Sequence, residues 1–292
     1  MRATRRRRAS RVEGRSHAER LASTDGYFAP ESVIRRVGNT PVTPFLGGGT
    51  AVLLQVAHPL VAAGVSDHSA YDADLWRRLL GTIRALYMVT FGTKAEADRT
   101  GDIVQAVHAR VNGATRTDLG VFPAGTDYSA DDPELMLWVH ATLVHASLSA
   151  YQRFEHRLSA AEQESYYADM ATVARIFGTP AEVIPPSLDA FREYFEAQLA
   201  GEAITVTEPA RQIAQMILHA PLPAPMRLLG PAHRLATAAQ LPARIRHEYG
   251  LRWTPARAPL LGVAGHSVRF GSWPVLRLAG RIRPAVPAAS SP

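Results

Sequence analysis

The stretch MLWVHATLVHASLSAY, residues 136–151, is apolar on nearly every side. A helix of this composition presents no polar face to water, which is the pattern of a central helix buried among other helices. The stretch also carries two histidines, His140 and His145. At about 100° per residue, five positions turn a helix by roughly 140°, so the two imidazoles point to different sides and cannot serve one site from the same face.

Helical spacing of apolar residues continues on both sides of this stretch. Turn and capping residues separate the helices, such as Asn112-Gly113 after one and Asp132-Pro133 before the next. The expected helices cover residues 48–64, 72–91, 94–112, 132–157, 161–177, 187–199, 208–220 and 231–248. Alternation typical of strands is limited to short pieces at 116–123 and 203–207. The sequence therefore predicts an all-α fold in a single domain.

Composition and charge divide the chain into a body and two ends. With 292 residues, 47% of them hydrophobic, the chain can bury a large core. The net charge of +6 lies in the ends: residues 1–20 hold eight arginines and two glutamates, and residues 251–292 hold six arginines and no acidic residue. We expect a disordered basic arm (1–25), a folded domain (26–260) and a partly disordered C-terminal extension (261–292).

The location of the charge bears on partners. Basic ends of this kind are typical of solvated tails, so we expect no nucleic-acid partner, whereas peripheral contact with a membrane surface stays open. No apolar segment follows the N-terminal arginines, so they do not form a secretion signal, and we expect a cytoplasmic protein. The longest apolar run, residues 45–65, is interrupted by Gln55, His58 and Pro59 and indicates buried helix rather than a transmembrane span. The oligomeric state is not indicated.

The first candidate for chemistry is this interruption. Proline lacks a backbone N–H, so Pro59 should kink or restart the helix and leave Gln55 and His58 beside freed carbonyls. Irregular backbone next to polar side chains suits a binding pocket. A structural histidine with its hydrogen bonds satisfied is the alternative for His58.

The second candidate is LWRRLLGTIRALYMVTFG, residues 75–92. Its apolar stripe consists of Leu75, Leu79, Ile83 and Leu86. Arg78 and Thr82 are four apart and lie together at the edge of the stripe. Gly81 beside them permits close approach of a flat or bulky group. The alternative is a solvated arginine and a threonine bonded to its own backbone.

The third candidate is His108 in DIVQAVHARVNG, residues 102–113. The apolar face of this helix consists of Ile103, Val104, Val107 and Val111, and His108 lies on it, so we expect an inward imidazole. Near a helix C-terminus the dipole favours imidazolium unless a metal replaces the proton. His140 is the fourth candidate, with a hydrogen-bonded core histidine as its alternative.

Several site chemistries lack their motifs. The chain has no cysteine, no H-E-x-x-H, no paired Glu-x-x-His for a di-iron site, no G-x-S-x-G and no phosphate-binding glycine loop. The remaining inventory is several inward histidines, an arginine and threonine pair, and a large helical core. It is compatible with haem held by one axial imidazole, with arginines available for the propionates.

Six blocks of the chain, in order, resemble the MpaB-type oxygenase family, whose relatives include the latex-clearing rubber oxygenases. They are QVAHPLVAAGVSDHS, RRLLGTIRALYMVTFG, AVHARVNG, YSADDPELMLWVHATLV, AYQRFEHRLSAAEQESYYADM and LPARIRHEYGLRW. The likeness extends from about residue 30 to residue 255. It implies a globin-like helical fold around haem b, and an oxygenase that uses dioxygen on a hydrophobic substrate, in its most specific form an isoprenoid-like unsaturated compound.

The resemblance also implies roles for residues. Arg78-Leu-Leu-Gly81-Thr82 is similar to the family's Arg-x-x-Lys-Thr motif, and His108 matches the histidine that ligates the iron. His140 matches a second family histidine that lines or supports the haem pocket, and Arg246 is a candidate to face a propionate. His145 matches no family residue and is interpreted as a core residue.

Gly81 is a departure from the family. The rubber oxygenases carry there a lysine that can occupy the distal side of the iron, and Lys94 is too far along the chain to replace it. Distal control would therefore come from Arg78, Thr82 or His58, with Arg78 and Thr82 polarising the oxygen, and polymer cleavage is not assumed. The alternatives are a non-catalytic haem or lipophilic-ligand binder and a peroxidase-like haem enzyme.

Overall fold

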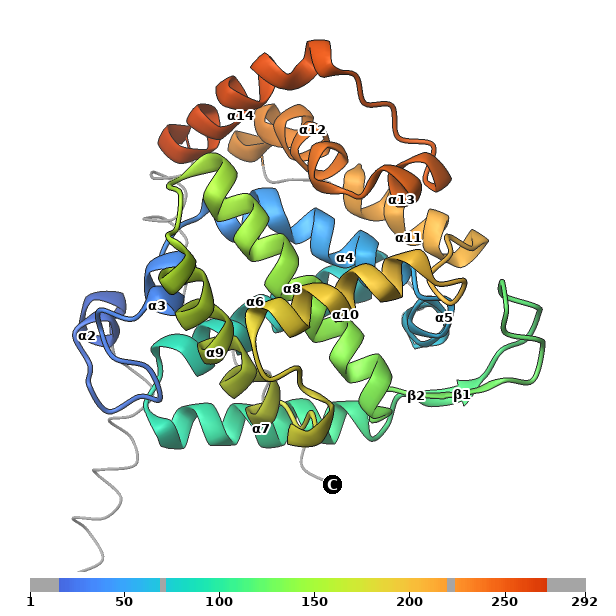
Figure 1. The fold of residues 1–292 in the computed structure, drawn as a ribbon, viewed down its shortest axis with the longest axis horizontal. Helices are drawn as coiled ribbons and strands as arrows, with labels where there is room; N and C mark the ends of the chain where they lie inside the picture. The colour runs from blue at the N-terminus through green and yellow to red at the C-terminus, as the bar shows by residue number, and fades with distance from the viewer. Residues whose placement is uncertain (1–15, 69–71, 220–223, 272–292) are drawn as a thin grey trace, which may run out of the picture.

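Helices dominate the computed structural model, which describes residues 16–68, 72–219 and 224–271 (Figure 1). Helix α8 (Pro133–Phe154) crosses the middle of the fold and is buried along most of its length. It begins where the sequence predicts, because the Asp132 side chain accepts hydrogen bonds from two free amides of the first turn and Pro133 needs no donor there. The predicted all-α fold in one domain is confirmed.

The other elements surround α8. In chain order they are α2 (His17–Leu21), α3 (Val33–Gly38), the π-helix η2 (Thr43–Gly47), α4 (Gly48–Val56), α5 (Pro59–Asp67), α6 (Asp72–Phe91), α7 (Lys94–His108), β1 (Asn112–Ala114), β2 (Asp127–Ser129), α9 (Ala160–Ile176), η3 (Ala181–Val183), α10 (Leu188–Ala200), α11 (Glu208–Leu218), η4 (Ala224–Leu229), α12 (Gly230–Gln240), α13 (Ala243–Glu248), η5 (Pro255–Arg257) and α14 (Ala258–Gly271).

Two of the expected helices are broken by proline. The segment 48–64 becomes α4 and α5, which meet at Pro59, and 231–248 becomes α12 and α13, which meet at Pro242. The short strands β1 and β2 pair antiparallel with Gly113 opposite Tyr128, and they lie on either side of the predicted extended piece 116–123. Residues 203–207 form no strand.

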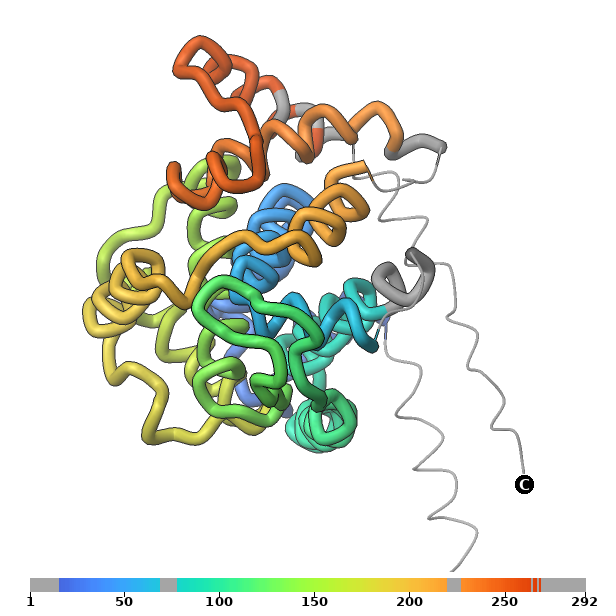
Figure 2. The backbone as a smooth tube through the Cα atoms, turned by 90° about the vertical axis from the view of Figure 1, so that its right-hand side faces the viewer, coloured from blue at the N-terminus to red at the C-terminus, as the bar shows by residue number. Residues whose placement is uncertain are grey.

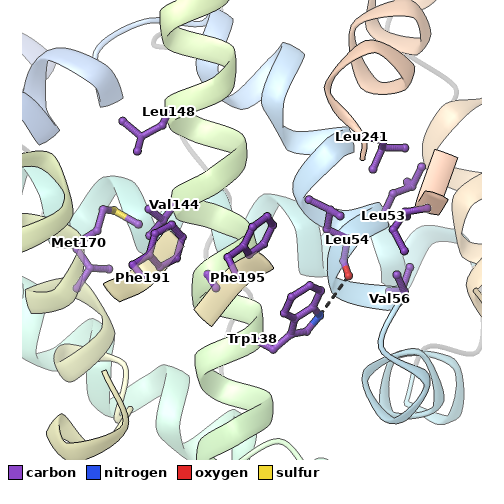
Figure 3. Close-up of a cluster of buried hydrophobic side chains, with 14 of the residues drawn as sticks. Leu53, Leu54, Val56, Trp138, Val144, Leu148, Met170, Phe191, Phe195 and Leu241 are labelled. Atoms are coloured by element: carbon purple, nitrogen blue, oxygen red, sulfur yellow. Dashed lines mark hydrogen bonds between the residues drawn. The ribbon is translucent and has the colours of Figure 1, made fainter. Parts of the chain in front are cut away.

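The core lies where α8 meets α4 and α10 (Figure 3). Trp138 is the largest fully buried side chain, and its ring stacks on Phe195 with centroids 5.6 Å apart. Leu53 and Leu54 of α4 lie beside this stack. The interpretation of residues 136–151 as a central buried helix is therefore confirmed.

Both ends of the described chain are more ordered than expected. From Ser16 onward the arm is folded: α2 has a capping box, and buried Arg20 forms an ion pair with Glu96 of α7 at 2.9 Å. This ion pair joins residues 16–21 of the predicted arm to the body, and residues 1–15 lie outside the description. Likewise α14 crosses the predicted boundary at 260 and packs on α12 through Leu261 and Val268.

The layer formed by α11 to α14 lies at one end of the molecule, and α7 lies at the other (Figures 1 and 2). Helix α8 connects the two ends, with its N-terminus near α7 and its C-terminus near α14. Within the described ranges, no single helix is long and apolar enough to cross a bilayer. The segment Thr43–Val56 passes that test only together with α5, to which it is bent by 102°.

Candidate functional site

The chain bends between α4 and α5 because Pro59 has no backbone N–H to donate. Pro59 cannot donate to the carbonyl of Gln55, one turn earlier, and the helix ends there. The indole Nε1 of Trp138 reaches from α8 and donates to the carbonyls of Leu54 (3.2 Å) and Gln55 (3.3 Å) (Figure 3). The Tyr249 hydroxyl donates to the Leu53 carbonyl at 2.6 Å. The predicted kink is confirmed, and its freed carbonyls have partners.

His58 lies at this junction as the N-cap of α5. Its Nδ1 accepts a hydrogen bond from the Leu60 amide at 3.3 Å, and its ring packs on Phe122 with centroids 5.4 Å apart. Burial lowers the pKa of His58 to about 4, and Asp132 opposes this only in part. His58 is thus a neutral imidazole with a structural role at Nδ1, as its alternative interpretation proposed. Gln55 is half-buried on the last turn of α4.

Helices α6 and α7 form a tight antiparallel hairpin beside this junction. A capping box between Thr93 and Glu96 begins α7 immediately after Gly92. The antiparallel course brings the first half of α6 level with the last turn of α7, and thus Arg78 close to His108. Burial lowers the pKa of His108, Asp131 opposes this, and the positive charge of Arg78 lowers it further.

Two imidazoles carry buried nitrogen atoms without a partner. Nδ1 of His108 and Nε2 of His140 are buried, and neither has a hydrogen bond within the described part of the chain. Burial lowers the pKa of His140 to about 4. Seven other buried side-chain atoms of the described residues also lack a partner, among them Thr50 Oγ1 and Gln240 Oε1. Buried polar atoms in folded proteins are normally paired, and an unpaired one calls for a cause such as an ordered water, an ion or a ligand. The inward orientation predicted for both side chains is observed, although His108 is only half-buried.

One turn of α6 is exposed within the described part of the chain. All five residues from Leu80 to Arg84 are exposed, and five consecutive positions cover the full circumference of a helix. Leu80 is 60% exposed, and a Cβ at Gly81 would have no atom within 4 Å. Ile103 (59% exposed) and Val107 on α7 are also open to solvent. Ile83, Ile103 and Val107 are therefore more exposed than their place on the apolar stripes predicts. The side of α7 that faces the core is formed by Ala97, Gly101, Val104 and His108 instead.

Of the two residues in the arginine and threonine pair, Arg78 fits the site interpretation and Thr82 fits the alternative. Arg78 is half-buried, and desolvation lowers its pKa, so it is not a solvated surface arginine. The exposed Thr82 donates its hydroxyl hydrogen to the Arg78 carbonyl at 3.1 Å and thus bonds to its own backbone. The side chain of Leu75 lies outside the described ones, whereas Leu79 and Leu86 pack on the core.

Arg246 lies away from His108 and Arg78 of the α6–α7 hairpin. Its Nη1 donates to the carbonyls of Ala238 (3.2 Å) and Leu241 (3.3 Å). The Ala238 carbonyl needs this donor because Pro242, one turn later, has no N–H. Helix α13 lies at the opposite end of the fold from α7 (Figure 1), so the predicted proximity of Arg246 to the other site residues is not found.

His145 is a core residue, as interpreted. Its ring stacks on Phe195 with centroids 4.5 Å apart, on the side of α8 that also holds Trp138. Burial lowers its pKa to about 4, against a smaller opposing contribution from the Gln240 backbone. Two site residues were missed by the sequence analysis: Trp138, which the lost donor at Pro59 could have suggested, and Asp131, whose proximity to His108 depends on the tertiary fold.

The buried histidines predict a pH dependence of stability. His58, His140 and His145 have pKa values of about 4 in the folded chain, and about 6.5 is usual when unfolded. Between these two pKa values the three imidazoles are protonated only in the unfolded state. Their contribution to the free energy of unfolding is therefore complete above pH 6.5 and decreases toward pH 4. The slope is at most about 1.4 kcal/mol per pH unit for each histidine. Urea midpoints at pH 7.5, 6 and 5 measure the slope. His145→Leu should make it shallower; an unchanged slope would contradict the assignment.

Comparison with known proteins places the chain in a class. The family model described as the catalytic domain of ER-bound oxygenase mpaB/B′ and rubber oxygenase matches residues 35–270. The chain belongs to this oxygenase family. Two curated relatives, uncharacterised proteins of Mycobacterium bovis and Mycobacterium tuberculosis, are each 28% identical over 244 residues, which is 80% of this chain and 87% of theirs. No solved structure matches at a significant level.

Proposed function

We propose that the chain is a haem b-dependent oxygenase that acts with dioxygen on a hydrophobic small molecule. The observation that carries this proposal is the pair of buried, unpartnered imidazole nitrogens, Nδ1 of His108 and Nε2 of His140. Family membership supports the oxygenase activity, and the haem is inferred from the residues.

The residues around His108 fit a haem better than a metal ion held by protein alone. No three His, Asp or Glu side chains in residues 16–68, 72–219 and 224–271 converge as ligands would around an ion. A metal at His108 would therefore need its other ligands from a macrocycle. The unpacked turn at Gly81 and the exposed apolar side chains of Leu80, Ile103 and Val107 offer space and an apolar surface for a flat, hydrophobic group.

Each residue has a distinct part in this proposal. When bound, haem supplies the redox-active iron that dioxygen chemistry needs. His108 holds it as a neutral imidazole, which its lowered pKa favours because no proton has to leave before ligation. Arg78, half-buried beside His108, places a positive N–H donor where charge on oxygen would develop. His140 would support the proposed haem site from α8, while Thr82 donates its hydroxyl hydrogen to the Arg78 carbonyl.

The more specific form of the proposal is cleavage of an isoprenoid-like carbon–carbon double bond. Such a cleavage places one atom of dioxygen on each carbon and needs no external reductant. The exposed apolar surface of Leu80, Ile103 and Val107 would be shared between the haem and the apolar chain of the substrate. This form rests on the family's rubber oxygenases together with that apolar surface.

Absorption spectra of the purified chain, oxidised and then reduced, test the proposal. A Soret band at a 1:1 ratio of haem to protein is expected, and its absence after expression with added haem would overturn the proposal. A haem spectrum without turnover of unsaturated lipids in air and reductant would indicate a binding protein instead. Turnover that is faster with peroxide than with dioxygen would indicate a peroxidase.

Gly81→Lys is expected to change the haem spectrum. A Cβ at Gly81 meets no atom within 4 Å, so the longer side chain fits, and lysine is a better helix former than glycine by about 0.8 kcal/mol. If haem binds against this turn, the amine would be an additional candidate ligand to the iron, and a low-spin ferric spectrum with slower cyanide binding is expected. Gly81→Ala, which adds no amine, is the matched control. Identical spectra of the two variants would show that position 81 does not face the iron.

A further inference from the structure

The layer at the end opposite the candidate site contains few acidic residues. Its described residues, 208–219 and 224–271, include eight arginines and two acidic residues, Glu208 and Glu248. The arginines are at 211, 227, 234, 244, 246, 252, 257 and 269. Glu208 pairs with Arg211 at 3.8 Å, and Glu248 pairs with Arg244 at 2.7 Å. The described part of this layer therefore keeps an excess of positive charge over its two carboxylates.

Large apolar side chains are exposed among these arginines. Leu228 on η4 is 87% exposed, and Val263 and Leu260 on α14 are 64% and 55% exposed. Helix α14 buries a different face, through Leu261 and Val268, so the outward face is not a core face left open. Elements η4 and α14 are in contact, which brings the exposed residues into one region.

A groove lies next to this region, between the C-terminal end of α8 and α14. It has a volume of about 430 Å³. Its lining residues are Gln152, Arg153, Phe154, Arg157, Ala258, Leu261 and Gly262. Arg153 and Arg157 are exposed and make no ion pair within the described ranges. The nearby Glu155 binds the Thr40 hydroxyl at 2.6 Å. Cationic and apolar side chains thus lie side by side at this groove.

We infer that this face docks on an anionic lipid bilayer. The C-terminal patch, defined as Arg153, Arg157, Arg257, Leu228, Leu260 and Val263, combines cations for lipid phosphates with apolar side chains that can enter the interface. A protein partner of acidic character would match the charge but gives no reason for three exposed aliphatic residues between arginines. Docking here leaves the α6–α7 hairpin facing away from the membrane (Figure 1).

Sedimentation of the full chain with vesicles tests the docking. Vesicles of phosphatidylcholine alone are compared with vesicles containing 30% phosphatidylglycerol, at low and high salt. We expect binding only to the anionic vesicles, weakened by salt. Arg153→Gln with Arg157→Gln should weaken binding roughly 10- to 30-fold, at about 5-fold for each arginine. Leu260→Ser with Val263→Ser should weaken it at least as much.

The matched control is Arg175→Gln with Arg192→Gln, which removes the same charge from exposed positions on α9 and α10. Its binding should stay within 2-fold of the wild type. Equal loss in control and patch variants would assign binding to net charge or to the arginine-rich segment 1–15, and would overturn the inference. So would absence of binding, or a dimer in gel filtration that Leu260→Ser with Val263→Ser dissociates. Unchanged circular dichroism and Soret spectra of the variants exclude misfolding.

Discussion

Replacement of His108 by alanine is expected to abolish haem retention. In the proposed site this imidazole is the protein's ligand to the iron, and no second histidine of the α6–α7 hairpin can replace it. Purified His108→Ala should show no Soret band after gel filtration, whereas the wild type retains haem at a ratio near 1:1. Alanine is a good helix former and His108 is half-buried at the last position of α7, so the fold should persist.

A matched control separates ligand loss from general damage. His219 lies at the C-cap of α11, where it is exposed and bonds to the Gln215 carbonyl. His219→Ala should keep both the Soret band and the circular dichroism spectrum of the wild type. A His108→Ala protein that retains haem as well as His219→Ala does would contradict the ligand assignment.

His140→Ala distinguishes the two unpartnered imidazoles. His140 is deeply buried on α8, and its Nε2 lacks a partner, so its proposed role is to line or support the pocket. We expect weaker haem retention or a shifted Soret maximum rather than complete loss. If His140→Ala abolishes retention while His108→Ala only weakens it, the two assignments are reversed.

The sequence was most informative where one residue's chemistry dictates local backbone. Asp132 and Pro133 define the start of α8, and Pro59 breaks the helix at Gln55 and His58 as predicted. The different directions of His140 and His145 around α8 were likewise predicted from about 100° per residue. These features depend only on residues close to one another in the chain, and the sequence alone therefore predicts them.

Other features depend on partners far along the chain. Helical period places Ile103 and Val107 on an apolar face, but only the tertiary fold shows which side of α7 faces the core. Ala97, Gly101 and Val104 lie on that side, and Ile103 and Val107 remain exposed. The resemblance made Arg246 a candidate to face a propionate, yet the carbonyl freed by Pro242 is its partner here. Arg20 was assigned to a disordered arm because its partner, Glu96, is 76 positions away.

Trp138→Ala is expected to give the largest loss of stability. Trp138 is 1% exposed, and removal of a buried tryptophan side chain costs about 3–5 kcal/mol. The variant also leaves the carbonyls of Leu54 and Gln55 without the indole donor. Urea unfolding followed by far-ultraviolet circular dichroism measures the free energy of unfolding without relying on tryptophan fluorescence.

Trp138→Phe separates packing from the hydrogen bonds. Phenylalanine can keep the stacking on Phe195 but cannot donate to the end of α4, so we expect an intermediate loss of about 1–3 kcal/mol. Because those carbonyls precede the kink at Pro59, amide exchange at Ala57 and His58 should accelerate more than elsewhere. If the Phe variant is as stable as the wild type and exchanges at the same rate, the indole does not hold this junction. In that case the placement of Gln55 and His58 depends on helix packing alone.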